Sequence, residues 1–258
     1  MTPSALITGG GTGIGSAAAR ALAERGYAVC VTGRRDAPLQ AVAGELGGLA
    51  VVADTADAAA VAGAVARTVE RFGGLDALVC SAGTGAAGTV TEQSLERWNA
   101  VVATNLTGAF LACQAALPHL LAASGAIVTV SSVAGLRAGP AAAAYSASKA
   151  GLIMLTRSMA VDYGPLGVRA NCVCPGWIRT AMADGEMDDL AARRGSGTRE
   201  DAYADATQAV PSRRPGTAQE AGEAVAWLAS PASSYVNGAV LPVDGGGSVV
   251  DVATLAFA

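Results

Sequence analysis

The 258-residue sequence predicts an α/β fold: a single doubly wound domain with a seven-stranded parallel sheet and helices on both faces. Short runs of Val, Ala and Leu alternate with longer helical stretches along the chain. These short runs are apolar throughout, which is typical of strands buried on both faces. Hydrophobic residues make up 52% of the chain and aromatic residues only 4%, a composition that suits close packing of helices on a buried sheet.

The first half of the chain alternates regularly between strand and helix. SALIT at 4–8 predicts the first strand, and the alanine-rich stretch at 13–26 predicts the first helix. Three further apolar runs, AVCVT, LAVVAD and ALVCSAG, predict strands that are separated by helical segments. These strands are expected at 28–32, 49–54 and 77–83, with helices at 37–46 and 57–72.

The second half continues the alternation and adds one irregular segment. Strands are expected at 126–132 (AIVTVSS), 168–176 (VRANCVCPG) and 239–246 (AVLPVDGG), with helices at 98–122, 143–163 and 217–229. Residues 177–215 are polar and irregular, and we expect them to form a lid over the substrate. Because helices join the strands, right-handed crossovers place all seven strands parallel in one domain spanning 1–258.

Charge and hydropathy exclude several functional classes. The 39 residues between Arg97 and Arg137 contain no Asp, Glu, Lys or Arg, but Asn105, Gln114 and Pro118 favour a buried helix and a strand over a membrane span. A net charge of −4 gives no electrostatic reason to expect nucleic acid or an anionic membrane as a partner. The N-terminus lacks the pattern of a signal peptide, so we expect a cytoplasmic protein.

Cysteine and histidine usage argues against a metal site. The chain has one histidine, His119, and five cysteines in mostly apolar runs, at positions 30, 80, 113, 172 and 174. Cys172 and Cys174 form the only closely spaced pair, which is too few ligands for zinc. We expect all five to be buried, reduced thiols and no metal to be bound. A serine hydrolase is also excluded, because no G-x-S-x-G elbow occurs and His119 lies beside a proline.

The loop TGGGTGIG joins the first strand directly to the first helix. Gly9, Gly13 and Gly15 permit a tight turn and let backbone N–H groups at the helix N-terminus approach a pyrophosphate. Their spacing, G-x-x-x-G-x-G, differs from the dinucleotide fingerprint G-x-G-x-x-G. A purely structural turn is the alternative, but the strand–turn–helix context favours a dinucleotide site.

The end of the second strand bears on the choice of cofactor. Arg34 and Arg35 follow the strand tip, where arginine suits the 2′-phosphate of NADP(H). Asp36 is the competing candidate, because a carboxylate there suits the ribose hydroxyl of NAD(H). An N-cap role for Asp36, with proline in the first turn of the helix, also explains it. We therefore favour NADP(H), with NAD(H) as the alternative.

Tyr145 and the only lysine of the chain, Lys149, are four residues apart. At this spacing both side chains emerge on one face of a helix. A nearby ammonium stabilises a phenolate and lowers the pKa of tyrosine from about 10, which favours acid–base chemistry. An exposed Tyr–Lys pair without function is the alternative.

Two further polar residues complete an ordered set. Ser132 ends a strand 13 residues before Tyr145, and Asn105 lies in the uncharged helix before that strand. With these four residues in order, the chain resembles the short-chain dehydrogenase/reductase family, in its short single-domain branch with a Rossmann-type fold. The resemblance extends through TGGGTGIG, Asp54, NLTG (105–108), SS (131–132), YSASK (145–149), PGWIRT (175–180) and VNGAVLPVDGG (236–246).

The resemblance implies a role for each of the four residues. Tyr145 would be the general acid in ketone reduction or the general base in alcohol oxidation. Ser132 would hold and polarise the substrate oxygen of a small carbonyl compound or secondary alcohol. Lys149 would bind the nicotinamide ribose and depress the pKa of Tyr145. Asn105 would anchor a water molecule that links Lys149 to solvent as a proton relay.

The resemblance also implies further contacts to the cofactor. Asp54 and Thr55 would contact the adenine, and Ile178 and Thr180 the nicotinamide amide. The remaining positions lie in the matching motifs: Ile14, Ala82, Gly83, Pro175 and Gly176.

The chain departs from the family pattern at two places. Cys80-Ser81 stands where the family has two asparagines, which alters the bonding around that strand end. Thr12 occupies a loop position where NADP-preferring members often carry a basic residue. A catalytically silent nucleotide-sensing or scaffold protein on the same fold is the alternative function. The apolar tail at 248–258 predicts a homo-oligomer, a tetramer or dimer, in which the tail packs across the interface.

Overall fold

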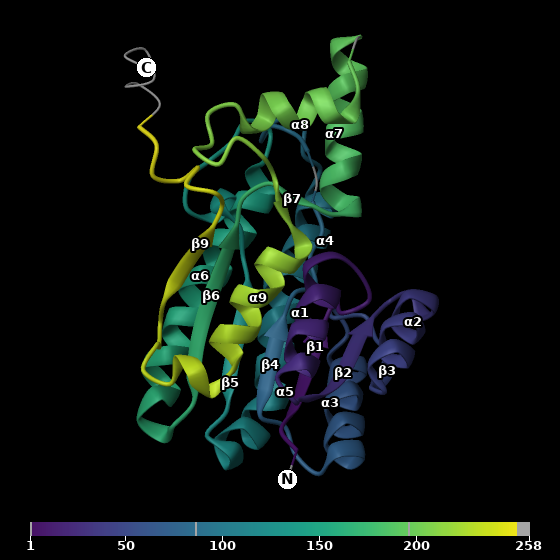
Figure 1. Ribbon diagram of the computed structural model, residues 1–258, viewed down its shortest axis with the longest axis vertical. Coiled ribbons are helices and arrows are strands. Elements are labelled where there is room, and N and C mark those ends of the chain that lie inside the picture. Colours follow the sequence, from purple (N-terminus) through teal and green to yellow (C-terminus); the bar gives the residue numbers. More distant parts are fainter. Residues whose placement is uncertain (1, 86, 196, 252–258) are drawn as a thin grey trace.

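The computed structural model describes residues 2–85, 87–195 and 197–251. Its main sheet has seven parallel strands in the order β3-β2-β1-β4-β5-β6-β9 (Figure 1). The strands are β1 Ser4–Thr8, β2 Ala28–Gly33, β3 Leu49–Val52, β4 Ala77–Cys80, β5 Ala126–Val130, β6 Arg169–Pro175 and β9 Val240–Val243. The predicted doubly wound, seven-stranded parallel sheet is confirmed.

Helices cover both faces of this sheet. On one face lie α1 (Gly13–Glu24), α2 (Asp36–Leu46) and α9 (Ala218–Ala229). On the other lie α3 (Ala58–Phe72), α5 (Gly108–Ala123) and α6 (Ala143–Tyr163). Strand residues alternate between the two cores: Ile7 packs with the first set of helices and Leu6 with the second. Burial of both faces explains why the strand sequences are continuously apolar.

Helix α5 continues a longer helical segment that starts at Leu95. Helix α4 (Leu95–Val102) is followed by a π-helical turn at Ala103–Thr107 and then by α5. Ser94 caps the N-terminus by accepting a hydrogen bond from the Arg97 backbone N–H, so the segment begins three residues earlier than predicted. By length and composition alone, Leu95–Ala123 is the one helix in the described part of the chain that could span a membrane. Its Ala112, Ala116 and Leu120 are fully buried against the sheet, as in a core helix.

Residues 177–215, predicted from the sequence to form a lid and called the lid segment here, are more ordered than the sequence predicts. The segment contains β7 (Ile178–Arg179), α7 (Ala181–Arg194), α8 (Arg199–Thr207) and β8 (Gly216–Thr217), and β7 pairs with β8 in a small second sheet. In Figure 1, α7 and α8 stand beyond the end of the main sheet that is remote from the N-terminus. The expectation of an irregular segment is therefore wrong.

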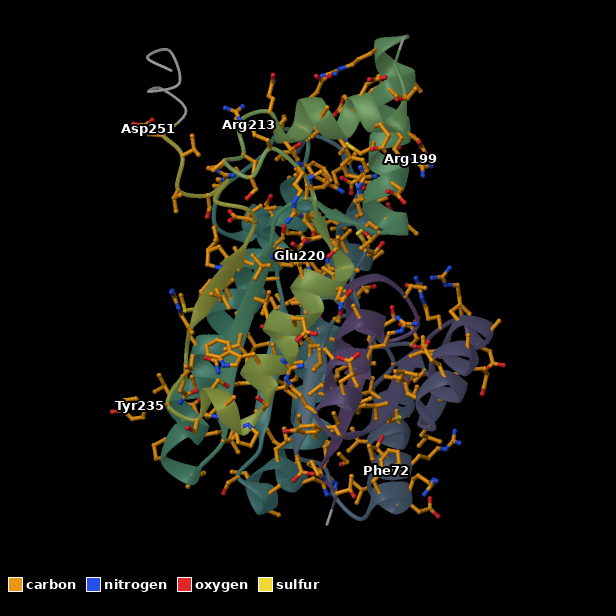
Figure 2. All side chains as sticks on the ribbon, in the orientation of Figure 1. Phe72, Arg199, Arg213, Glu220, Tyr235 and Asp251 are labelled. Atoms are coloured by element: carbon orange, nitrogen blue, oxygen red, sulfur yellow. The ribbon has the colours of Figure 1, made fainter. Side chains whose placement is uncertain are left out.

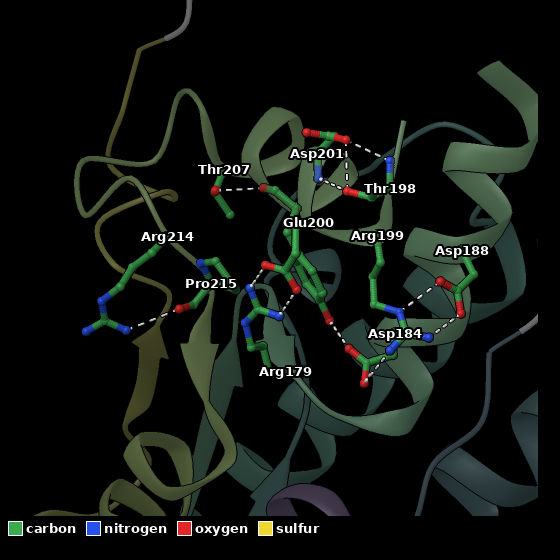
Figure 3. A network of polar contacts seen from close by, with 11 residues as sticks. Arg179, Asp184, Asp188, Thr198, Arg199, Glu200, Asp201, Thr207, Arg214 and Pro215 are labelled. Atoms are coloured by element: carbon green, nitrogen blue, oxygen red, sulfur yellow. Dashed lines mark hydrogen bonds and ion pairs between the residues drawn. The ribbon is translucent and has the colours of Figure 1, made fainter. Parts of the chain in front are cut away.

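A small core and a polar network hold the lid helices together. Tyr203 and Met187 are buried between α7 and α8. The Tyr203 hydroxyl donates to Asp184 Oδ1 at 2.8 Å, and its ring lies 4.5 Å from the Arg179 guanidinium. Figure 3 shows the surrounding ion pairs, Arg179 with Glu200 and Arg199 with Asp188. The lid charges are thus largely paired with one another.

All five cysteines are buried and free, as predicted. The described residues contain no group of three or more His, Cys, Asp or Glu side chains arranged to hold a metal ion.

Candidate active site

The glycine turn brings the start of α1 against the end of β1. A Cβ at Gly15 would lie 2.3 Å from the Gly9 carbonyl oxygen, and Gly9 itself has a left-handed φ of 67°. Thr12 occupies the N-cap position without making a side-chain hydrogen bond to the helix. Ile14 is half-buried and packs on the core. The first N–H groups of α1 therefore lack a side-chain cap, and only glycine permits so close a turn.

The carboxyl end of β4 lies beside this turn. A Cβ at Gly9 would lie 2.8 Å from both N and Cα of Ala82. The backbone N–H groups of Ser81 and Ala82 donate to Thr8 Oγ1 at 3.2 and 3.3 Å. Cys80 is buried, with its thiol 3.9 Å from Cys113 Sγ. Thr8 thus fixes this strand end, where the family pattern uses asparagine amides.

Asn105 lies in the π-helical turn, and its side chain makes three hydrogen bonds. It is 1% exposed, its Oδ1 accepts from the Thr84 N–H at 2.8 Å, and its Nδ2 donates to the Thr84 carbonyl at 2.9 Å. Nδ2 also donates to Ser148 Oγ at 3.0 Å. Asn105 therefore joins the loop after β4 to helix α6. Single π-helical turns of this kind are frequent at functional sites.

Lys149 is buried at the centre of the same region. It is 4% exposed, and its Nζ donates to the Val130 carbonyl at 2.8 Å. Nζ lies 5.6 Å from the centroid of the Tyr145 ring. A Cβ at Gly83 would lie 3.4 Å from this Nζ. Burial lowers the pKa of Lys149 from 10.5 to about 8.

Tyr145 and Ser132 lie beside this ammonium. Burial raises the pKa of Tyr145 above 10, the Ser132 hydroxyl partly opposes this, and the Glu186 carboxylate adds to it. Desolvation of the phenol outweighs, in the net pKa, the lowering that the sequence predicted from Lys149. The Ser132 Oγ accepts from the Ala134 N–H at 3.1 Å.

The strand end that carries Ser132 is fastened to the helix that carries Lys149. The neighbouring Ser131 Oγ donates to the Lys149 carbonyl at 2.8 Å. A Cβ at Gly135 would lie 2.8 Å from the Lys149 carbonyl carbon, so the turn Val133–Gly135 packs directly on the α6 backbone. Ser132 and Tyr145 are therefore held in a fixed relation.

The residues predicted to select the cofactor lie beyond the tips of β2 and β3. Arg34 and Arg35 are exposed, and within the described residues neither guanidinium has a hydrogen bond or an ion pair. Asp36 opens α2 and accepts a hydrogen bond from Gln40, so it is the first helical residue and not the predicted N-cap. Thr55 is buried against Gly108, and Asp54 accepts a hydrogen bond from the Ala56 N–H.

The segment after β6 leads from the sheet into the lid. Pro175 pairs with Val243 in β9, and a Cβ at Gly176 would lie 2.8 Å from Asp244 Cβ. Ile178 is buried in β7, and the Thr180 hydroxyl caps α7 by accepting from the Ala183 N–H. A Cβ at Gly13 would lie 3.2 Å from Thr180 Cγ2. The start of the lid thus meets the glycine turn.

Asn105, Ser132, Tyr145 and Lys149 are brought together by these contacts, and the predicted nucleotide-side residues lie along the same edge of the sheet. Sequence reasoning missed Ser148, which joins Asn105 to the Tyr145 carbonyl (2.7 Å), and Glu186. Ser148 lies within the YSASK motif, so the motif itself could have indicated it.

Comparison with known proteins agrees with this geometry. Residues 9–248 match the family described as Enoyl-(Acyl carrier protein) reductase. The chain is 44% identical over 254 residues to Protein MoaE of Klebsiella aerogenes, covering 98% of both chains. It is 38% identical to 2-(R)-hydroxypropyl-CoM dehydrogenase of Xanthobacter autotrophicus, covering 95% of this chain and 98% of the relative. The chain belongs to the short-chain dehydrogenase/reductase family.

Solved structures of short-chain dehydrogenases/reductases share the whole fold. Levodione reductase superposes with a TM-score of 0.91 at 35% identity, covering 96% of this chain and 98% of the other. An actinorhodin polyketide ketoreductase, solved with NADPH, gives the same TM-score and coverage at 33% identity. As a short-chain dehydrogenase/reductase, this chain is an oxidoreductase of alcohols and ketones that uses NAD(P)(H).

Proposed function

We propose that the chain transfers a hydride between NADP(H) and a small ketone or secondary alcohol, with Tyr145 as the acid–base residue. One observation carries the proposal. The Tyr145 phenol, the Lys149 ammonium and the Ser132 hydroxyl converge beside Asn105 on elements that are fastened to one another. A nucleotide-sensing scaffold, the alternative function, has no need of a serine hydroxyl beside a buried phenol.

The glycine turn fits a dinucleotide. The start of α1 has no side-chain cap, and only glycine at positions 9 and 15 lets the turn pack this closely on the backbone of Ala82 and of Gly9. Gly9, Gly13, Ile14 and Gly15 would hold the pyrophosphate. The other nucleotide contacts would come from the residues expected from the sequence: Asp54, Thr55, Ala82, Gly83, Pro175, Gly176, Ile178 and Thr180.

In this proposal Tyr145 supplies the proton during ketone reduction. Burial keeps its pKa high, so the phenol is protonated near neutral pH and can donate to the carbonyl oxygen. Ser132 holds and polarises that oxygen. When bound, the nicotinamide supplies or accepts the hydride. In alcohol oxidation, the Tyr145 phenolate formed by loss of this proton accepts the hydroxyl proton of the alcohol instead.

Lys149 and Asn105 support this proton transfer. The Lys149 ammonium, with a pKa of about 8, stabilises negative charge on the phenol and would bind the nicotinamide ribose. Asn105 and Ser148 link the loop at Thr84 to the Tyr145 carbonyl, and Asn105 would anchor the relay water. These residues hold the phenol in position while its proton is exchanged with solvent.

The preference for NADP(H) over NAD(H) rests on Arg34 and Arg35. Both are exposed beside the tip of β2, and no partner among the described residues competes for their guanidinium groups. Asp36 is held by Gln40 at the start of α2, which leaves its carboxylate less free for a ribose hydroxyl.

Two features beyond the site complete the proposal. The substrate class agrees with relatives named for secondary alcohols, such as meso-2,3-butanediol dehydrogenase of Serratia marcescens, which is 34% identical over 249 residues. A homo-oligomer, a tetramer or dimer, is supported by exposed apolar residues such as Met154 and Val161 on α6. The cytoplasmic location rests on the sequence alone.

Replacing Tyr145 by Phe tests the function. We expect hydride transfer from NADPH to a panel of small ketones to fall by about 10²–10⁴-fold, because the proton donor is lost. Binding of NADPH, followed by fluorescence titration, should change little. Turnover by Tyr145→Phe at near the wild-type rate would remove the assignment, and the absence of any hydride transfer by the wild type would favour the scaffold alternative.

A further inference from the structure

Glu186 differs from most of the other carboxylates of the lid. Helices α7 and α8 contain seven acidic residues, and five of them have a partner: Asp184 and Asp188 with Arg199, Glu200 with Arg179, Asp201 with Thr198, and Asp205 with Arg194. Within the described residues, only Glu186 and Asp189 have neither a hydrogen bond nor an ion pair. Glu186 is therefore available to a ligand.

The Glu186 carboxylate lies on the side of α7 that faces the catalytic residues. A Cβ at Gly85 would lie 3.8 Å from Glu186 Oε1. Gly85 follows Thr84, whose backbone holds Asn105, so this oxygen is close to the loop that borders the site. The carboxylate is also near enough to Tyr145 to raise the pKa of its phenol. Glu186 thus lies near both the Thr84–Gly85 loop and Tyr145.

Among the described residues, no lysine or arginine pairs with Glu186, although Arg199 pairs with Asp184 and Asp188 on the same helix. Partial burial raises the pKa of its carboxyl group, and the neighbouring Asp189 carboxylate adds to this effect. The nearest ammonium of the site, Lys149, is buried behind Tyr145 and bonded to the Val130 carbonyl. An ammonium placed beside Glu186 would compensate the negative charge of its carboxylate, whereas a neutral hydroxyl could donate a hydrogen bond but supply no charge.

We propose that Glu186 is a specificity-determining residue that binds an ammonium group on the substrate, so that the site selects amino alcohols and the corresponding amino ketones. The proposal rests on the function proposed for the same site. A charge-assisted hydrogen bond from the ammonium to the carboxylate orients the carbinol toward Tyr145 and Ser132. The same carboxylate repels substrates that carry a carboxylate or a phosphate.

Matched substrates and two matched variants test the proposal. Oxidation of 1-amino-2-propanol, 1,2-propanediol and 2-butanol is compared for the wild type, Glu186→Gln and Asp189→Asn. Each variant removes one negative charge from α7, but only Glu186 is near Tyr145. Calorimetric titration of the three compounds into the enzyme–NADPH complex supplies a readout that does not depend on turnover.

We expect the wild type to prefer the amino alcohol by about tenfold or more, both in kcat/KM and in affinity. Glu186→Gln should lose this preference, and Asp189→Asn should retain it. With 2-butanol, the pH profile of Glu186→Gln should shift to lower pH, because a carboxylate that raises the pKa of Tyr145 is gone.

Several results would overturn the proposal. One is a wild type that binds the amino alcohol no better than the diol, and another is a loss of preference in Asp189→Asn equal to that in Glu186→Gln. If Glu186→Gln lost as much kcat/KM and affinity for the diol as for the amino alcohol, Glu186 would recognise hydroxyl groups instead. Reduction of neutral ketones by the wild type tests the proposed oxidoreductase function separately. Failure of that function is therefore distinguishable from failure of the proposed preference for amino alcohols.

Discussion

Lys149, the only lysine of the chain, owes its chemistry to burial. Within the described part of the chain its ammonium has one hydrogen bond, to the Val130 carbonyl, and lies near the Tyr145 ring. Because few polar groups replace the lost water, its pKa falls from 10.5 to about 8. In the unfolded chain the ordinary value returns, so the pKa shift also affects folding stability.

The pH dependence of stability should reveal this shift. Between the folded value of about 8 and the unfolded value of 10.5, the unfolded chain binds more protons. The free energy of unfolding of the wild type, measured relative to that of a Lys149→Met variant, therefore rises with pH across this window by up to about 3 kcal/mol. Urea unfolding of both proteins below and above this pH window measures the difference. The contributions of all other titratable groups are common to the two proteins and cancel. A difference that does not change with pH would contradict the burial argument.

Arg34 supplies a second test at a single side chain. Arg34→Ala should weaken binding of NADPH far more than binding of NADH, because only NADPH carries the 2′-phosphate. We expect a loss of at least about tenfold for NADPH, from one charge-assisted contact. Titration of the wild type and the variant with both cofactors measures this loss of affinity. Arg157→Ala is the control, because Arg157 is also exposed but lies on α6. Equal losses for the two cofactors would remove the argument for NADP(H).

The sequence predicts the part of the candidate site that is formed by side chains at a fixed spacing along the chain. Tyr145 and Lys149 share a helix face by register, and Ser132 follows a strand end. Thr84 was not predictable, because it holds Asn105 through backbone atoms alone. Glu186 was not predictable either, because its position near Tyr145 depends on how α7 packs.

At the scale of elements, burial decides what the sequence reveals. The five central strands of the main sheet are largely buried, so their apolar runs were recognisable, but ALVCSAG continues for three residues after β4 ends at Cys80. Helices α7 and α8 share only a small apolar core, and their many charged residues obscure the helical periodicity of its apolar positions. Those charges pair across 11 residues in Arg199–Asp188 and 21 in Arg179–Glu200. The π-helical turn before α5 is a change of hydrogen-bond register, which side-chain periodicity does not show.

The lid helices depend on one aromatic residue. Tyr203 is 1% exposed and forms the largest part of the small core between α7 and α8. Tyr203→Ala should loosen the lid by about 3–5 kcal/mol, because a large buried side chain is removed. Hydrogen exchange should accelerate over residues 181–207 while the main sheet stays protected.

Tyr203→Phe is the matched control for this prediction. It keeps the ring packed beside Arg179 and loses only the hydrogen bond to Asp184, which contributes about 1 kcal/mol. In Tyr203→Ala, hydrogen exchange accelerates as much over the main sheet as over the lid only if the two unfold together. That result would show that the lid is not a separate cooperative unit.

The whole molecule presents apolar surface that a monomer would leave in water. Met154 and Val161, two turns apart on one face of α6, are 61% and 74% exposed. At the far end of the molecule from the lid, Tyr235 projects fully into solvent (Figure 2). Val249 is 82% exposed at the start of the apolar tail. Residues 252–258, which carry most of the predicted interface segment, lie outside the described residues.

Truncation of the tail tests whether it stabilises an assembly. If residues 249–258 pack across a subunit interface, their removal deletes apolar contact area on both sides of a symmetric contact. We expect the mass in solution, measured by light scattering, to fall from that of a tetramer or dimer to a smaller species. Val249→Asp is a milder probe, because a carboxylate buried at the interface would weaken assembly at low protein concentration. An unchanged mass for the truncated chain would place the interface elsewhere, with the exposed face of α6 as the first surface to examine.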